Sequence, residues 1–198
     1  MSAPGNDNDT EPRLSGMLLR DGAAVLALLS LWAAADTWTA ATDLLLAQAV
    51  AIADGVLVGA LLAAVLHEWG HYAGARAAGA VAPRVSPRGL SLFRYRFDFA
   101  ANDQRQFHWM TGGGHVGHWS ALLLLLSLVP MDTPGRVALA AGAFGFISFA
   151  TFIEANVVMD TRQGADPLQR LQALSRKDFQ QSTRAGVVAG LIVLAVFS

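Results

Sequence analysis

The sequence predicts an α-helical polytopic membrane protein with about five transmembrane helices and a small membrane-associated β-hairpin. Three observations support this fold class. Apolar residues make up 54% and charged residues only 15% of the 198 residues, whereas soluble domains contain about 25% charged residues. The apolar residues also form blocks that are too long for the core helices of a soluble domain. Between two of these blocks lies a polar segment with the alternating pattern of strands.

Net charge and cysteine content limit the kinds of partner and of metal site that the chain can have. The formal net charge of −1 gives no indication of a nucleic-acid partner. Cysteine is absent, which excludes cysteine-ligated zinc and leaves histidine and carboxylate side chains as metal ligands. Residues 1–16 are polar and acidic, unlike a cleaved signal peptide, so we expect a disordered tail there and one membrane-embedded domain over 17–198.

Five apolar blocks are expected to span the membrane: 17–35, 55–79, 115–130, 137–159 and, shortest, 185–197. The second block belongs to a longer apolar stretch, 44–79, which as one straight helix would be about 54 Å long. Because the hydrocarbon core is only about 30 Å thick, we expect a break or a strong tilt near Asp54 and Gly55.

The segment between the second and third spans predicts a β-hairpin over 81–100. Residues 90–100 (LSLFRYRFDFA) alternate between an aromatic and a charged face, and Pro87-Arg88-Gly89 supplies the turn. The hairpin either lies with its aromatic face against the membrane or the helices, or is an ordinary surface hairpin.

Positive charges are concentrated in alternate loops. The loops after the second and fourth spans contain eleven Arg or Lys residues, whereas the other two loops contain only Arg136. By the positive-inside rule, the N-terminus, the hairpin and the region around Asp166 are predicted to be cytoplasmic. The second span would then run from the outside to the inside.

The second span contains the motif His67-Glu68-Trp69-Gly70-His71. His67 and His71 are i and i+4, so on a helix both imidazoles leave the same face and can share a tetrahedral zinc ion. Glu68 is close enough to take a proton from a metal-bound water, but it is poorly placed as a third ligand. Ionisable residues are costly inside a membrane helix, which favours a metal site over a structural histidine pair.

A catalytic zinc site needs a third protein ligand and an open position for water. The metzincin pattern would place a third histidine at position 77, where this chain has Ala77. The remaining candidates lie at the start of the third span or around the end of the fourth, and their spacing does not choose among them. They are His115, His118, Glu154, Asp160 and Asp166.

The segment HEWGHYAGARAAGA resembles the HELGHxxxAxxxG membrane helix of the site-2 protease family of intramembrane zinc metalloproteases. The resemblance covers about residues 55–174. The predicted hairpin takes the place of the family's membrane-associated strands, and Gly114–His118 takes the place of its Gly-x-x-x-Asn element. Asn156 followed by Asp166 resembles the family's Asn…Asp-Gly segment, whose aspartate binds zinc.

The resemblance implies three ligands for Zn²⁺, namely His67, His71 and Asp166. It also implies that Glu68 is the catalytic base. Pro167 stands where the family has glycine, which keeps Asp160 as an alternative and also makes Asp166 a plain helix N-cap candidate. His118 stands where the family usually has asparagine. Its side chain either forms a hydrogen bond at the start of the helix or binds the carbonyl group of the substrate.

The sequence thus predicts a zinc metalloendopeptidase of the bacterial inner (cytoplasmic) membrane that cleaves in or near transmembrane segments. The resemblance implies a transmembrane regulatory protein or a remnant signal peptide as substrate. The alternative is a non-hydrolytic carrier that uses His67, Glu68 and His71 as a relay for metal ions or protons. Carriers usually contain repeated halves, and no internal repeat is evident in this sequence, which favours the enzyme.

Overall fold

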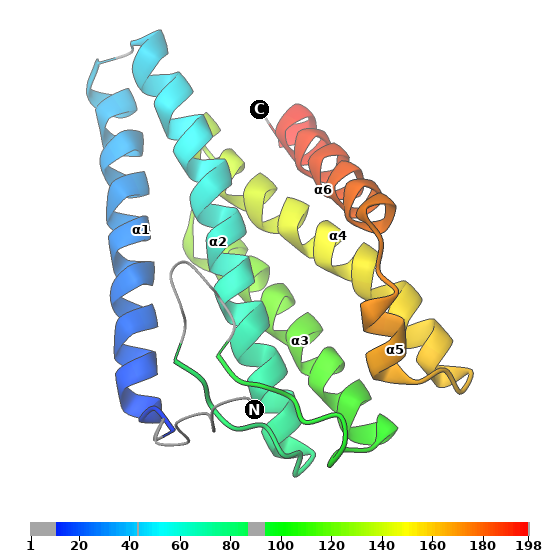
Figure 1. The fold of residues 1–198 in the computed structure, drawn as a ribbon. Coiled ribbons are helices and arrows are strands. Elements are labelled where there is room, and N and C mark those ends of the chain that lie inside the picture. The colour runs from blue at the N-terminus through cyan, green and yellow to red at the C-terminus, as the bar shows by residue number, and fades with distance from the viewer. Residues whose placement is uncertain (1–10, 43, 87–93, 198) are drawn as a thin grey trace, which may run out of the picture.

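The computed structural model describes residues 11–42, 44–86 and 94–197. Within these ranges the chain forms helices and no strand (Figure 1). The helices are α1 (Leu14–Thr42), α2 (Leu45–Ala77), α3 (Gln104–Leu128), α4 (Pro134–Arg162), α5 (Pro167–Gln172) and α6 (Arg176–Phe197).

Four helices among the described residues, α1, α2, α4 and α6, are long and apolar enough to cross a membrane. This agrees with the predicted class of helical membrane protein. The predicted third span, 115–130, corresponds to the second half of α3, which ends at Leu128 and is not among the four. Helix α3 has no stretch of membrane-spanning length as apolar as those of the four, because it begins with Gln104-Arg105-Gln106 and carries glycines, His115 and His118 in its middle.

The helices are longer than their predicted spans. Helix α1 already begins at Leu14, inside the predicted tail, of which residues 1–10 lie outside the described residues. Helix α2 runs through Gly55 without interruption. Of the two expected alternatives the break is therefore wrong, and the strong tilt stays a prediction. A Cβ atom at Gly55 would lie 2.6 Å from the Gly135 carbonyl oxygen of α4. This glycine therefore permits close helix packing and does not end a helix.

The predicted β-hairpin over 81–100 is not formed as a pair of strands in the described residues. One isolated antiparallel bridge joins Arg84 and Tyr95. Backbone hydrogen bonds of 3.0–3.1 Å continue the pairing on both sides of it, and the predicted turn lies outside the described residues. Phe97 is buried and packs with Phe107 and Met110 of α3. The aromatic alternation therefore reflects packing against helices, because two short strands alone gain little stability.

Helix α2 is the centre of the bundle and lies against α1, α3 and α4 (Figure 1). Its contact with α3 is a backbone-to-backbone approach: a Cβ atom at Gly70 or Gly113 would overlap the backbone of the facing helix. Gly117 of α3 is equally close to the backbone of Leu66. The glycines of the GGGHVGH segment thus allow a close approach of the two helices, while they themselves remain helical. This approach places the α3 histidines beside the HEWGH motif.

A buried ionic cluster fastens α1 and the segment that begins at Arg94 to the same part of α2. The Asp21 carboxylate accepts hydrogen bonds from Trp69 Nε1 at 2.9 Å and from Arg94 Nε at 2.5 Å. Asp21 and Arg94 are only 5% and 3% exposed. Because buried charges need such partners, the cluster fixes the segment after Arg94 along the side of the motif helix.

Candidate metal centre

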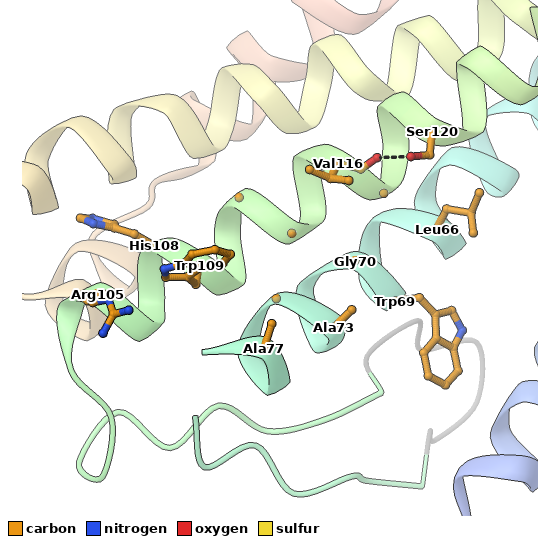
Figure 2. Close-up of a pocket in the computed structure, with 14 residues that line it drawn as sticks. Leu66, Trp69, Gly70, Ala73, Ala77, Arg105, His108, Trp109, Val116 and Ser120 are labelled. Atoms are coloured by element: carbon orange, nitrogen blue, oxygen red, sulfur yellow. Dashed lines mark hydrogen bonds between the residues drawn. The ribbon is translucent and has the colours of Figure 1, made fainter. Parts of the chain in front are cut away.

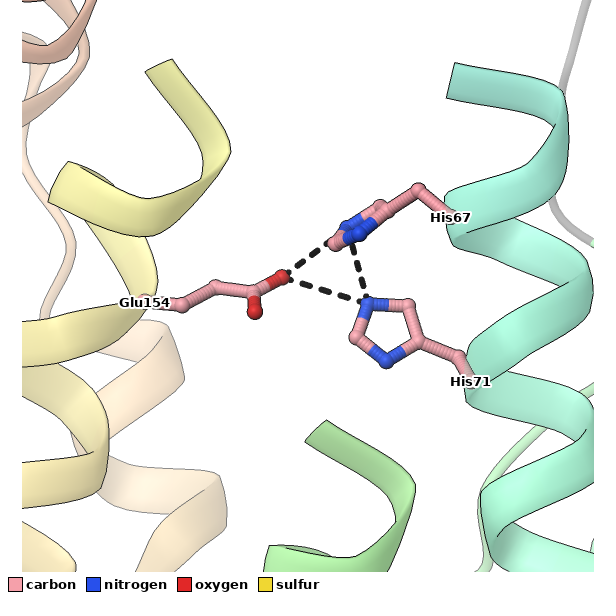
Figure 3. Close-up of side chains that lie close together, drawn as sticks. All are labelled: His67, His71 and Glu154. Carbon is pink, nitrogen blue, oxygen red and sulfur yellow. Dashed lines mark hydrogen bonds and ion pairs between the residues drawn. The ribbon is translucent and has the colours of Figure 1, made fainter. Parts of the chain in front are cut away.

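Three side chains from two helices converge on one point (Figure 3). His67 and His71 come from α2 and Glu154 comes from α4, and their ligand atoms all lie within 4.8 Å of one another. The two histidine Nε2 atoms are 2.9 Å apart. Glu154 Oε1 lies 3.0 Å from His67 Nε2 and 3.2 Å from His71 Nε2.

The hydrogen bond on the far side of His71 determines which of its ring nitrogens faces this point as an acceptor. His71 Nδ1 is 2.9 Å from the Met110 carbonyl oxygen, which can only accept. In the neutral ring Nδ1 therefore carries the proton, and Nε2 presents a lone pair toward His67 and Glu154. A histidine oriented by a backbone carbonyl is a common arrangement for metal ligands. Two imidazoles and a carboxylate fit a three-ligand zinc site with one open position.

Glu68 lies in the same cavity as the three converging side chains. This cavity has a volume of about 380 Å³ and is otherwise walled mainly by apolar and aromatic residues, including Tyr95, Phe97, Phe99, Phe107, Leu171 and Leu174. Glu68 is half-buried, and its Oε2 atom accepts no hydrogen bond within the described part of the chain. A buried carboxylate oxygen without a donor is available to a water molecule. The sequence prediction that Glu68 stands beside the two histidines without joining them as a ligand is consistent with this geometry.

The structure does not bring Asp166 to the histidines, although the family resemblance implies it as the third ligand. Asp166 is exposed, and its carboxylate caps α5 by accepting a hydrogen bond from the Gln169 amide at 2.8 Å. Asp160 forms an ion pair with Arg170. Helix α4 continues to Arg162 and carries Asp160 beyond the level of the histidines, so Glu154 takes the third position. Glu154 was among the sequence candidates as the acidic residue inside the fourth apolar block.

The α3 histidines lie behind the converging groups. His118 is 0% exposed, and its Nδ1 lies 3.1 Å from His67 Nδ1. His115 Nε2 is 3.3 Å from Glu154 Oε2. Gly114, one turn before His118, lies against the His71 imidazole so closely that a Cβ atom there would overlap the ring. Both histidines were candidates from the sequence, but their position behind His67 and Glu154 depends on helix packing that no local pattern indicates.

A larger apolar groove of about 930 Å³ lies along α2 and α3 and shares no lining residue with the cavity of the candidate centre. Figure 2 shows Trp69 and Ala73 of α2 along one side and Trp109 and Val116 of α3 along the other. The groove is therefore not the cavity in which Glu68 and the three converging side chains meet.

A comparison of the chain with protein-family models, curated proteins and solved structures finds no match. The resemblance to the site-2 protease family consequently depends on the sequence motifs alone.

Proposed function

We propose that the chain is an intramembrane zinc-dependent endopeptidase in which His67, His71 and Glu154 hold the metal. The convergence of these three side chains beside Glu68 is the observation that carries the proposal. An HExxH helix with a carboxylate from another helix is the ligand set of many zinc peptidases. Glu154 thus takes the place of Asp166 as the third ligand, while His67, His71 and Glu68 keep the roles that the resemblance implies.

When bound, zinc supplies Lewis acidity for the scissile carbonyl and for a water molecule. The residues of the chain do the remaining work. Glu68, which has an unpartnered oxygen in the cavity, takes the proton of that water and delivers it to the leaving amine. Met110 holds the His71 ring in the orientation that leaves Nε2 free. The apolar cavity walls exclude bulk water and strengthen these interactions.

The segment after Arg94 is suited to hold an extended substrate. The amides of Arg96 and Asp98 bond to the 81–85 segment, whereas the backbone groups of Tyr95 and Phe97 make no bond with described residues. An unwound substrate segment can pair with this free edge by main-chain hydrogen bonds. Burial raises the pKa of the Tyr95 phenol, so its hydroxyl stays protonated and can donate a hydrogen bond at the cavity wall.

The location of the centre supports a substrate within the membrane. Both helices that carry it, α2 and α4, are among the candidate spans. A substrate helix must unwind there before a peptide bond is exposed. We propose transmembrane proteins or signal-peptide remnants as substrates, and a bacterial inner membrane as the location. The start of α1, the described parts of the connection between α2 and α3 (78–86 and 94–103) and α5 lie at one end of the bundle (Figure 1). By the positive-inside rule we propose that this end is cytoplasmic.

A non-hydrolytic carrier remains the second candidate, because a specific observation favours it. The three converging residues are joined by His115 and His118 into one polar cluster inside an apolar bundle. Connected histidines and carboxylates of this kind also form proton relays in membrane pumps. A substitution of Glu68 distinguishes the peptidase from the carrier, because only hydrolysis requires this residue as a base.

The test replaces Glu68 by glutamine, which keeps the size of the side chain but cannot accept the proton. Purified parent and Glu68→Gln proteins should both retain about one zinc ion per chain. Membranes from cells expressing the parent should contain new protein N-termini within transmembrane segments, and the variant should reduce their formation by about a hundredfold or more. Equal N-terminus formation by both proteins would refute the peptidase and favour the carrier.

A further inference from the structure

A continuous chain of imidazole contacts runs from one proposed metal ligand to another. His67 Nδ1 is 3.1 Å from His118 Nδ1, and His118 Nε2 is 3.4 Å from His115 Nδ1. His115 Nε2 then lies 3.3 Å from Glu154 Oε2. The last contact is an ion-pair distance without the angles of a hydrogen bond, because Glu154 Oε2 has no hydrogen-bond partner among the described residues.

The proton position on one ring determines the positions on the others. If His67 Nε2 keeps its lone pair for a metal, the proton of the neutral ring is on Nδ1 and is donated to His118 Nδ1. His118 must then carry its own proton on Nε2 and donate it to His115 Nδ1. His115 in turn carries its proton on Nε2, which faces the Glu154 carboxylate. The opposite assignment would place the lone pair of His115 against a carboxylate oxygen.

The packing around His118 fixes its ring in the orientation that this chain requires. The planes of the His67 and His118 rings lie within 8° of each other, with centroids 5.0 Å apart. Phe146 of α4 meets both rings edge-on, at centroid distances of 5.5 Å and 6.4 Å. His118 has no solvent exposure, so water cannot replace the contact with His67. A buried donor of His67 without this acceptor would be unsatisfied.

We propose that His118 is a positioning residue. It accepts the Nδ1 proton of His67, which leaves His67 Nε2 free for a metal, and it donates its own Nε2 proton to His115 Nδ1. The proposal rests on the metal centre of the proposed function. His118 thereby does for His67 what the Met110 carbonyl does for His71, and both imidazole ligands are oriented from behind. His115 turns its Nε2 toward the second Glu154 oxygen, Oε2, at a distance of 3.3 Å without forming a hydrogen bond.

The test measures zinc affinity of the detergent-purified chain by competition with a chromophoric chelator. His118→Phe keeps a ring in the buried space but removes the acceptor, and it should weaken zinc binding by about 10- to 100-fold. His118→Asn places an amide oxygen where Nδ1 stood and should recover affinity to within a few fold of the parent. His108→Phe is the matched control on the same helix, because His108 bonds to Thr161 outside the chain of imidazoles, and it should leave the affinity unchanged.

A second measurement uses the parent protein and does not depend on the folding of a variant. Ring-nitrogen NMR of the zinc-loaded chain, with histidine labelled with ¹⁵N, should show His67 protonated on Nδ1, and His118 and His115 protonated on Nε2. The reverse tautomers would overturn the proposal, as would a folded His118→Phe variant that binds zinc within twofold of the parent. A parent that binds no zinc would refute the metal centre, and with it the proposed function. Normal zinc binding that is insensitive to His118 would refute only the positioning role.

Discussion

Replacement of Glu154 by glutamine is expected to remove most of the zinc affinity of the protein. The Glu154 carboxylate is the one negatively charged group whose oxygen lies within 3.2 Å of both histidine Nε2 atoms among the described residues. Structural zinc sites with four ligands are worth about 10–16 kcal/mol, or about 2.5–4 kcal/mol per ligand. Loss of one ligand should therefore weaken zinc binding by about a hundredfold to a thousandfold. Glutamine keeps the volume of the side chain, so the helix packing should be preserved.

Two matched substitutions allow this experiment to identify which acidic residue is the third zinc ligand. Asp166→Ala removes only the cap of α5, at a cost of about 1 kcal/mol, and should leave zinc binding unchanged. Asp160→Ala removes a partly exposed ion pair with Arg170, worth about 1 kcal/mol or less, and should also leave it unchanged. Zinc content measured by mass spectrometry and affinity measured by chelator competition give the readout. If Asp166→Ala strips the metal while Glu154→Gln retains it, the proposed ligand set is wrong.

The remaining predictions concern the support of the site and the topology of the chain. Gly114→Ala should weaken zinc binding at least about tenfold, because the added Cβ displaces the His71 imidazole. Gly112→Ala, whose Cβ would meet no atom within 4 Å, is its control, and equal affinities in the two variants would contradict the expected clash. A cysteine at Asp132 should react with an impermeant thiol reagent in intact cells, whereas a cysteine at the exposed Ala101 should react only after permeabilisation. The reverse labelling pattern would invert the proposed orientation.

The sequence by itself determined the features that depend on local periodicity. The i, i+4 spacing of His67 and His71 places both rings on one face of any helix, so the pair could be predicted without knowledge of its neighbours. The apolar blocks likewise predicted the helices, because their burial or membrane insertion depends on composition over a long window. Glu68 follows His67 directly, and its place in the cavity comes from the same helix.

Only the tertiary structure decided the features that depend on the register between helices. Glu154, Asp160 and Asp166 are all acidic residues near the end of the fourth apolar block, and the packing of α4 on α2 determines which of them meets the histidines. The aromatic alternation of 90–100 is equally suited to a strand or to a segment packed on helices, and the contact of Phe97 with α3 decides between them for the described residues. The glycine at 55 allows either a break or a close helix contact, and the facing backbone of α4 makes it a contact. In each case the deciding interaction is with a segment that is distant in sequence, which local patterns do not encode.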